Sequence, residues 1–302
     1  MDNVLDLIEK GKIKRVFRAR EKFSYPEACC HITQRAPGKE MLFLEEADYL
    51  SMLHFIKEKS QKFAFEVYSF SLMPNHLHLQ IKLKQNNLPE AMKSLFGDYA
   101  QLFNDKYKRK GHVFCGPYRQ ALCLDDGYAL TTSIYIHLNA VRAGLVAYPW
   151  DYRWSSCNLY VPDVEIKSFI NENFILNLLN EDMQQARKIY QKLLTEAADI
   201  KIEEVWENRD VLNLFKLRLF QKVPIFRELQ EKLSKKETMN VPGEDLLDEK
   251  IEELKKKHRL REPQDIQARK YLIEQLKARG FSIVMIAEKL NISRQSIYNI
   301  LT

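Results

Sequence analysis

Residues His76 to Leu83 read HLHLQIKL, and this stretch decides how the first half of the chain folds. Its polar and apolar side chains alternate, which is typical of a β-strand because successive side chains point to opposite faces. His76, His78 and Gln80 therefore share one face, while leucine and isoleucine side chains share the other. We expect a strand with one apolar and one polar face, and the polar face brings two imidazoles close together.

Strand and helix patterns alternate around this strand. β-Branched and aromatic runs predict three further strands, at residues 28–34, 65–72 and 118–124. Apolar side chains at helical spacing predict three helices, at residues 45–61, 90–107 and 127–143. We expect Gly111 and Gly144 to end the last two helices, and Asp125 or Asp126 to cap the third. This order predicts an α+β domain with a ferredoxin-like antiparallel sheet and its helices on one side.

The second half of the chain is helical in pattern. Leucine-rich helical periodicity begins near residue 161, and we expect no further strand. Lys222-Val223-Pro224 interrupts it, residues 235–243 have the composition of a linker, and residues 244–259 predict a highly charged helix. We therefore predict three parts: the α+β domain at 1–160, a helical connecting region at 161–235 and an all-α domain at 236–302.

The overall composition excludes several classes of protein. Of the 302 residues, 45% are hydrophobic and only 9 are glycine, which excludes fibrous and low-complexity chains. No apolar run approaches the roughly 18 residues of a membrane-spanning helix, and acidic residues precede the first short apolar stretch, unlike in a secretory signal. The five cysteines form no C-x-x-C pair, so neither a disulfide framework nor a zinc-thiolate site is indicated. We expect a cytoplasmic protein.

Basic residues are concentrated in the first half of the chain. Residues 1–160 hold 22 Lys and Arg against 17 Asp and Glu, whereas the remainder is nearly balanced. One basic cluster lies within residues 12–39 and a second within 106–110, and both are interleaved with aromatic side chains that suit a groove for a nucleic-acid backbone. A solvated basic face explains the same pattern. The candidate DNA contacts in these clusters are Arg15, Arg18, Arg20, Arg35, Lys108 and Arg109.

Four side chains form a candidate catalytic site. His76 and His78 can reach one metal ion from their shared strand face, although paired strand histidines are also ordinary polar residues of a half-buried sheet. Tyr135 and Asn139 share one face of the third expected helix, as a nucleophile and a third metal ligand would. Core packing of Tyr135 and a helix that ends at Asn139 explain the same spacing. Two imidazoles and an amide oxygen suit Mg²⁺ or Mn²⁺.

Four motifs, in this order along the chain, resemble those of a known family. They are SLMPNHLHL at 71–79, GHVFCGP at 111–117, YIHLNAVRAGLV at 135–146 and DYRWSS at 151–156. Together they resemble the single-tyrosine transposases of the HUH endonuclease superfamily, with REP-associated tyrosine transposases as the nearest branch, over about residues 12–160. The resemblance implies that His76, His78 and Asn139 bind the metal and that Tyr135 attacks DNA. Ala140 replaces a proline common in the family, so we expect the helix to continue past Asn139.

The resemblance implies an enzyme that cleaves and rejoins single-stranded DNA, at hairpin or REP-like sequences, through a 5′-phosphotyrosine intermediate with Mg²⁺ or Mn²⁺. Charge neutralisation matters because a tyrosine with a free pKa near 10 is only about 0.1% ionised at pH 7. Tyr99, Tyr107 and Tyr128 compete for the role of nucleophile. Gln80 either contacts the substrate or the metal's water, or is a polar sheet residue. Both a monomer and a homodimer fit the sequence.

Residues 283–301, IVMIAEKLNISRQSIYNIL, fit a helix-turn-helix template. Asn291 occupies the turn position that needs a positive φ, and Ser293 is placed to cap the second helix. The positions expected to face duplex DNA are Arg294, Gln295, Tyr298 and Asn299. With residues 268–280, this segment resembles trihelical DNA-binding domains of the Trp-repressor or replication-initiator type, which implies a tether to duplex DNA. A helical hairpin without a DNA role fits the same pattern.

Two other functions compete with strand cleavage. The stretch His76 to Gln80 also resembles the H-hydrophobic-H-hydrophobic-Q strand of histidine-triad nucleotidyl transferases, in which the second histidine is the nucleophile. Lys82 interrupts the apolar pair that this motif requires, and Tyr135 and Asn139 are left unexplained. Under the second hypothesis the chain is a non-catalytic regulator that binds DNA through its C-terminal unit. That hypothesis predicts that Tyr135→Phe leaves function unchanged.

Overall fold

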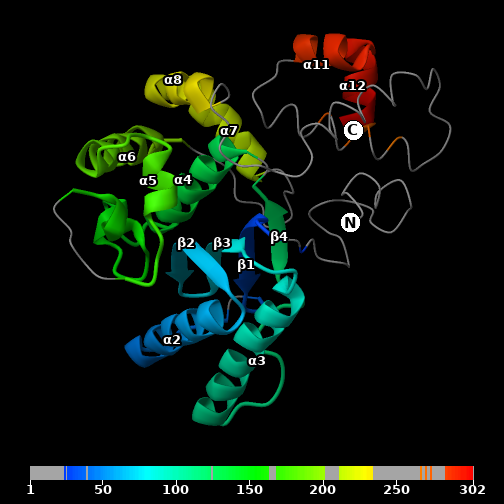
Figure 1. The fold of residues 1–302 in the computed structure, drawn as a ribbon. Helices are drawn as coiled ribbons and strands as arrows, with labels where there is room; N and C mark the ends of the chain where they lie inside the picture. The colour runs from blue at the N-terminus through cyan, green and yellow to red at the C-terminus, as the bar shows by residue number, and fades with distance from the viewer. Residues whose placement is uncertain are drawn as a thin grey trace. The chain divides into compact units, whose positions relative to one another are not determined.

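Four antiparallel strands form the sheet of the first half of the chain (Figure 1). They are β1 (Cys29–Arg35), β2 (Phe65–Met73), β3 (His76–Leu83) and β4 (Arg119–Leu122), in the spatial order β2-β3-β1-β4. Helix α2 (Glu46–Lys62) connects β1 to β2, and helix α3 (Leu88–Tyr107) connects β3 to β4. This order and connectivity are ferredoxin-like and confirm the expected α+β sheet.

The structure is a computed structural model that describes most of the chain. The described residues are 24, 26–38, 40–123, 125–162, 168–200, 211–233, 266, 269, 270, 273 and 283–301. Arg15, Arg18 and Arg20, the expected linker at 235–243 and the expected charged helix at 244–259 lie outside them. Across these described ranges, no helix is both long enough and apolar enough to cross a lipid bilayer.

Helices cover both faces of the sheet, not the single face that we expected. α2 and α3 lie side by side against one face, and α4 (Asp126–Arg142) lies against the other, where it contacts β2 and β3 (Figure 1). The polar face of β3 is therefore buried as well, and only Lys82 of this strand is partly exposed. Hydrogen bonds from β3 side chains to α4 and to the neighbouring strands make this burial tolerable.

The two-residue turn Pro74–Asn75 sets the register of β2 and β3. The first residue of β3, His76, pairs with the last residue of β2. The backbone amides of Ala36 and Leu42 donate to the two carbonyls of the turn at 2.9 and 2.7 Å, which anchors it. A slip of one residue would move every β3 side chain to the opposite face. The anchored turn therefore decides that His76 and His78, and not the leucines that alternate with them, face α4.

Helix α4 begins and ends where the sequence indicates. The Asp125 carboxylate accepts a hydrogen bond from the backbone amide of Tyr128, which caps the helix. Gly144 adopts a left-handed φ of 67° just after the last turn. With Ala140 in place of a proline, the helix continues past Asn139 as expected.

Helix α3 ends at Tyr107, where its expected range 90–107 ends, but Gly111 is not the residue that ends it. Lys108 adopts a left-handed φ of 52°, and its amide donates to the carbonyl of Asn104, which ends the helix. Gly111 lies further on in the loop, with a φ of 110°. The expectation that Gly111 ends this helix is therefore wrong, because a lysine adopts the conformation for which glycine is most often used.

The chain after α4 covers the outer edge of β2. It contains the short 3₁₀ turns η1 (Pro149–Asp151) and η2 (Cys157–Tyr160) and the helices α5 (Asn173–Asn177) and α6 (Met183–Ala197). Backbone hydrogen bonds of 2.8–3.1 Å join β2 to this segment: Leu72 to Trp154, Phe70 to Ser156 and Val67 to Asn171. They pair an edge strand that would otherwise expose its backbone. Up to Asp199, the described residues form one compact unit.

Four helices of the described chain belong to a second compact unit that follows Asp199. α7 (Val211–Lys222) and α8 (Pro224–Leu233) contact each other across the break expected at Lys222-Val223-Pro224. α11 (Ile283–Leu290) and α12 (Arg294–Leu301) also contact each other. Their buried side chains include Ile286, Leu290 and Ile297.

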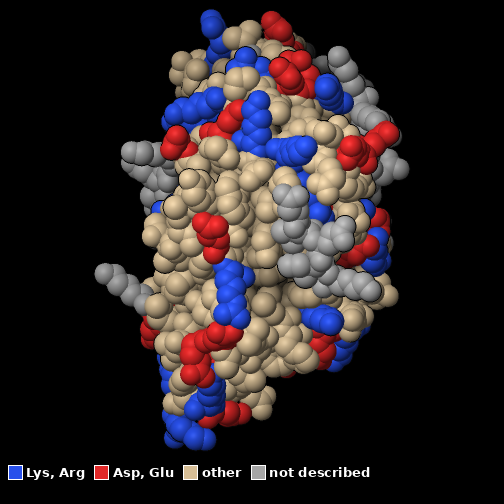
Figure 2. Space-filling model, turned by 90° about the vertical axis from the view of Figure 1, so that its left-hand side faces the viewer, with Lys and Arg blue, Asp and Glu red and all other residues tan. Residues whose placement is uncertain are grey.

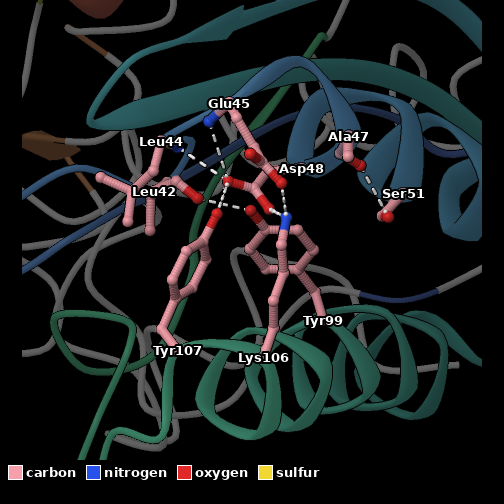
Figure 3. A network of polar contacts seen from close by, with 9 residues as sticks. All are labelled: Leu42, Leu44, Glu45, Ala47, Asp48, Ser51, Tyr99, Lys106 and Tyr107. Atoms are coloured by element: carbon pink, nitrogen blue, oxygen red, sulfur yellow. Dashed lines mark hydrogen bonds and ion pairs between the residues drawn. The ribbon is translucent and has the colours of Figure 1, made fainter.

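A buried carboxylate joins the start of α2 to the end of α3 (Figure 3). Asp48 is fully buried and accepts hydrogen bonds from the amides of Leu44 and Glu45 at 2.8 and 3.1 Å. It also accepts from the Tyr107 hydroxyl, at 2.8 Å, and from the Lys106 ammonium. Burial alone raises the pKa of this carboxyl, but these hydrogen bonds outweigh burial and hold the pKa below its ordinary value. Asp48 thus fastens α2 to α3.

Replacing Asp48 by asparagine should remove the charge on which this junction depends. We expect Asp48→Asn to lower the free energy of unfolding by about 2 kcal/mol at neutral pH. Because the folded-state pKa is lowered, the difference from wild type is fully present above the ordinary carboxyl pKa of about 4 and is lost as pH falls through the folded-state pKa. Urea unfolding of both proteins across that range measures it.

The matched control for this prediction is Asp105→Asn, which removes an exposed carboxylate from α3. It should change the free energy of unfolding by less than about 0.5 kcal/mol. Equal stability of wild type and Asp48→Asn at neutral pH would contradict the role assigned to Asp48.

Candidate active site

His76 and His78 lie side by side on the buried polar face of β3. Their ring centroids are 5.1 Å apart and the rings are nearly perpendicular. The β1 residues that pair with them across the sheet are Arg35, opposite His76, and Thr33, opposite His78. Both imidazoles are largely buried, with exposed fractions of 7% and 3%. The structure therefore brings the two histidines to one point between the sheet and α4.

Each imidazole has its Nδ1 atom engaged in a hydrogen bond. Nδ1 of His76 lies 2.7 Å from the side-chain oxygen of Asn75, and this oxygen can only accept, so the hydrogen is on Nδ1. Nδ1 of His78 lies 2.9 Å from Nε2 of His31 on β1. The Nε2 atom of His78 is buried and has no hydrogen-bond partner among the described residues. This set of contacts leaves Nε2 of His78 available for another ligand.

Helix α4 brings Asn139 and Tyr135 to the same place. The Asn139 amide nitrogen donates to the Tyr135 carbonyl at 2.8 Å. The Asn139 side chain also forms a hydrogen bond with His76 that raises the pKa of this imidazole. The side-chain oxygen of Asn139 therefore lies beside the imidazole of His76. The Tyr135 ring makes edge contacts with the rings of His31 and His78, at centroid distances of 6.1 and 5.8 Å. All four side chains predicted from the sequence are thus brought together.

Two arginines supply positive charge at this site. The guanidinium carbon of Arg142, on the last turn of α4, lies 5.0 Å from the centre of the Tyr135 ring. Burial, with a smaller contribution from the charge of Arg35, lowers the pKa of His76 to about 4, although the contact with Asn139 raises it. Burial, together with the nearby histidines and Arg142, holds the pKa of His78 well below its ordinary value. Both imidazoles are neutral at pH 7, which is the form that binds metal ions.

The residues present fit a divalent metal. The candidate donor set consists of two histidines and one asparagine. It is not a cluster of three or more His, Cys, Asp or Glu side chains, and no such cluster suited to a metal occurs in the part of the chain that the structure describes. A metal here would use the imidazoles of His76 and His78 and the amide oxygen of Asn139, a donor set that suits Mg²⁺ or Mn²⁺ when phosphate oxygens complete the coordination. The buried, unpartnered Nε2 of His78 is the observation that supports this fit.

Gln80 holds the helix against the sheet. Its side-chain oxygen accepts from the Ser69 hydroxyl at 2.9 Å, and its amide nitrogen donates to the carbonyl of Ala129 in α4 at 2.9 Å and to the Cys29 sulfur at 3.8 Å. These contacts use both ends of the amide. Of the two roles expected for Gln80, its contacts match that of a polar sheet residue, and they tie β3 to α4.

A second polar network fixes α4 from its other side. Ser133 and His137 lie roughly opposite Tyr135 and Asn139 around the helix, because successive residues are about 100° apart. The Tyr190 hydroxyl of α6 lies 2.7 Å from both the Ser133 hydroxyl and Nδ1 of His137. Nε2 of His137 lies 2.8 Å from the hydroxyl of Ser156. We call these four residues, Ser133, His137, Ser156 and Tyr190, the His137 network.

The His137 network is buried and neutral. His137 and Tyr190 are fully buried, and burial lowers the pKa of His137 to about 3. The network therefore has no route to a substrate, and its hydrogen bonds act on the position of α4. It determines the rotation of the helix about its own axis, and with it the direction in which Tyr135 and Asn139 point.

The competing tyrosines are engaged elsewhere or buried. The Tyr99 hydroxyl donates to the Leu42 carbonyl, and the Tyr107 hydroxyl belongs to the Asp48 junction (Figure 3). Tyr128, on α4, is 2% exposed and Tyr135 is 5% exposed, so burial alone does not distinguish these two tyrosines. Among the tyrosines considered, the described contacts place Tyr135 beside both His78 and a cationic side chain.

The expected DNA contacts of the first half differ in their surroundings. Lys108 is exposed at the end of α3, whereas Arg109 forms an ion pair of 2.6 Å with Glu40 and lies over the Phe103 ring. Arg35 lies at the end of β1 beside the candidate metal site. Figure 2 shows basic and acidic side chains intermingled on one face. Of these residues, Arg35 is therefore the one placed at the candidate site.

The C-terminal positions expected to face DNA are exposed. Asn291 has a left-handed φ of 51°, and the Ser293 hydroxyl accepts from the amide of Ser296 at 3.0 Å, so the turn between α11 and α12 has the expected local geometry. The Gln295 side chain donates to the Asn299 side chain at 3.0 Å. The expected DNA-facing residues Arg294, Gln295, Tyr298 and Asn299 all lie on the exposed side of α12.

Sequence reasoning missed three residues of this region. They are His31, Arg142 and His137. The alternation in the β1 stretch CCHITQR places His31 and Thr33 on one face, but only the pairing of β1 with β3 shows that this face meets His78. Arg142 follows Tyr135 by seven residues, two helical turns, which is a signal that sequence spacing does provide.

The match to a family model agrees with the motifs. Residues 27–139 match the model of a family described as Transposase IS200 like. A solved structure described as a REP-associated tyrosine transposase bound to a REP hairpin is 13% identical, and the similarity covers 51% of this chain and 94% of that chain with a TM-score of 0.43. No curated protein matches the chain. The matched segment of the family contains the whole sheet and ends at Asn139.

Removing the central hydroxyl of the His137 network should destabilise the fold. We expect Tyr190→Phe to lower the free energy of unfolding by about 2 kcal/mol, because Ser133 and His137 would lose a buried partner. Urea unfolding measures the difference. Tyr148→Phe, at a tyrosine that is 56% exposed, is the matched control and should leave stability within about 0.5 kcal/mol of wild type. A Tyr190→Phe protein as stable as the control would refute this role.

Proposed function

We propose that this chain cleaves and rejoins single-stranded DNA through a covalent link to Tyr135. Its residues 27–139 match the family described as Transposase IS200 like, which supports the proposal. One observation carries the proposal: the Tyr135 ring lies against His78 and shares its face of α4 with Asn139, beside the buried imidazole pair of β3. A nucleophile and a candidate phosphate-binding centre therefore lie together at one site.

The covalent step exchanges one phosphodiester for another. The Tyr135 oxygen attacks the scissile phosphorus, a bond from phosphorus to the tyrosine oxygen forms, and the bond from phosphorus to the 3′ oxygen breaks. The phenol loses its proton and the departing 3′ oxygen gains one, so the products are a 5′-phosphotyrosine and a free 3′-OH. Attack by the 3′-OH of another DNA end reverses these changes and releases Tyr135. No nucleotide cofactor is needed because the phosphodiester energy is conserved.

The side chains around Tyr135 have distinct parts in this step. His76, His78 and Asn139 would hold Mg²⁺ or Mn²⁺, which supplies positive charge to a non-bridging oxygen of the scissile phosphate when bound. Arg142 lies over the Tyr135 ring and keeps a permanent positive charge beside the reacting group. Packing against His31 and His78 holds the tyrosine ring in place before the substrate arrives, which reduces the entropy lost on reaction.

The proposed substrate is a single strand that carries a hairpin, such as a REP-like element. Support comes from the motif resemblance and from Arg35, a cation at the end of β1 that is placed beside the site. To attack a phosphate inside a duplex, Tyr135 on α4 would have to reach a strand that is held by base pairing and stacking. An unpaired strand can instead bend into the site. We propose no oligomeric state.

Covalent capture of labelled hairpin DNA tests the central proposal. Wild-type protein, Mn²⁺ and a 3′-labelled single-stranded hairpin should yield a labelled protein band on denaturing gels, because the tyrosine keeps the 5′ phosphate of the 3′ portion. The same oligonucleotide with a 5′ label should give no labelled protein. We expect the band to disappear in Tyr135→Phe and in His76→Ala.

The matched control is Tyr128→Phe, which removes a phenol hydroxyl from the same helix two turns earlier. It should retain the covalent band. Persistence of the band in Tyr135→Phe would exclude this nucleophile, and a band that carried the 5′ label would exclude the proposed polarity. Tight DNA binding without any band would favour the hypothesis of a non-catalytic regulator.

We propose further that α12 binds duplex DNA near the cleavage target. The specific observation is local geometry: a left-handed Asn291 and a capping Ser293 connect two short helices, and Arg294 and Gln295 are exposed on the first turn of the second. The first turn of a recognition helix is where base contacts are made in helix-turn-helix proteins.

Loss of two α12 side chains should weaken duplex binding. We expect the double variant Arg294→Ala, Gln295→Ala to lower duplex affinity at least about tenfold, because one base or phosphate contact is worth about 1–3 kcal/mol. Electrophoretic mobility shifts at fixed salt measure it. Arg218→Ala removes one exposed charge from α7 and is the matched control. Equal affinity of wild type and double variant would rule out α12 as the duplex contact, while covalent capture of hairpin DNA would be unaffected.

A further inference from the structure

His31 contacts His78 of the candidate metal site, and neither the motifs nor the comparisons assign it a role. It lies on β1, is 6% exposed, and stacks on His78 with ring centroids 5.1 Å apart and an interplanar angle of 14°. Its Nε2 atom lies 2.9 Å from Nδ1 of His78. The Thr33 hydroxyl lies 3.4 Å from both of these nitrogens and closes the space beside them.

Two arrangements of hydrogen atoms satisfy the 2.9 Å contact. In the first, Nδ1 of His78 donates to His31, and Nε2 of His78 carries a lone pair. In the second, His31 donates to Nδ1 of His78, and the hydrogen of His78 is on Nε2. Nε2 of His78 is buried without a hydrogen-bond partner among the described residues, so either arrangement leaves it unpaired in the metal-free protein. Only in the first arrangement can a bound cation satisfy it, because a lone pair binds a cation and an N–H does not.

The first arrangement is therefore the one that a metal requires. An imidazole binds a cation through a nitrogen that carries no hydrogen, and the hydrogen bond made by the other nitrogen determines which one that is. Asn75 already has this effect on His76, because its side-chain oxygen accepts from Nδ1 at 2.7 Å. His31 stands in the same relation to His78 from the neighbouring strand.

We propose that His31 is a positioning residue for the candidate metal site: it accepts the Nδ1 hydrogen of His78 and keeps the Nε2 lone pair of His78 directed at that site. This role rests on the proposed function, because it has a purpose only if His76 and His78 bind a metal. The edge contact of His31 with Tyr135 adds a second effect, since one side chain then orients both a ligand and the nucleophile.

The hydrogen position on His78 provides a direct test in the metal-free protein. Long-range proton–nitrogen NMR correlations distinguish an imidazole protonated at Nδ1 from one protonated at Nε2. We expect His78 to be protonated at Nδ1 in wild type and to shift toward Nε2 in His31→Leu, which offers no acceptor. His31→Gln places an amide near the position of Nε2 and should preserve the Nδ1 form.

Metal affinity provides the second readout, independent of DNA cleavage. Titration of Mn²⁺ followed by electron paramagnetic resonance should show a dissociation constant about 10- to 100-fold higher in His31→Leu than in wild type, the usual loss when a partner of a ligating histidine is removed. His31→Gln should restore most of the affinity. His54→Leu, at an exposed histidine of α2, is the matched control and should bind as wild type does.

The outcomes separate this inference from the function on which it rests. Wild-type Mn²⁺ binding that His76→Ala does not weaken overturns the metal site itself and, with it, the role of His31. Binding that depends on His76 but is unchanged in His31→Leu overturns only the role of His31, as does a wild-type His78 protonated at Nε2. If His31→Leu fails to fold, His31→Gln decides the matter: a folded His31→Gln that loses Mn²⁺ affinity as fully as His76→Ala contradicts the proposal.

Discussion

The register of β3 between β1 and β2 is the constraint on which the rest of the site depends. The anchored turn Pro74–Asn75 fixes it, and side chains two residues apart then share a face. In this register His76 and His78 face α4, and His31 lies beside His78. A shift of one residue would exchange the imidazoles for leucines and would expose polar side chains to the apolar layer that α2 and α3 cover. One face of β3 therefore carries the candidate catalytic residues, and the other face contributes to the hydrophobic core.

Helix α4 supplies the other half of the site, and its orientation is fixed from two sides. Gln80 bonds it to β3, and the His137 network bonds its opposite side to the edge of β2 and to α6. Because both networks are buried, rotation of the helix would break hydrogen bonds that water could not replace. Tyr135 and Asn139 are consequently held toward the histidines. This explains why a short stretch of sequence beyond α4, which has no catalytic signal of its own, bears on the candidate site.

The sequence alone was sufficient for the strand and helix order, for the antiparallel α+β class and for the grouping of His76, His78, Tyr135 and Asn139. Alternation along β3 and the spacing along α4 are local properties, so they can be read without a structure. Burial of the polar β3 face was not predictable, because it depends on where α4 packs, and the helices were wrongly expected on one side. The role of His31 depends on strand pairing, and that of His137 on contact with Tyr190, which is 53 residues away.

The central claim is that His76, His78 and Asn139 meet one metal ion beside Tyr135. Anomalous diffraction at the manganese absorption edge tests it most directly. The crystals would contain the Tyr135→Phe variant, which cannot cleave DNA by the proposed mechanism, together with Mn²⁺ and a hairpin oligonucleotide that carries the target site. We expect a single strong peak within coordination distance of Nε2 of His76, Nε2 of His78 and the side-chain oxygen of Asn139. A manganese peak elsewhere, or hairpin DNA bound with no peak at these three atoms, would contradict it.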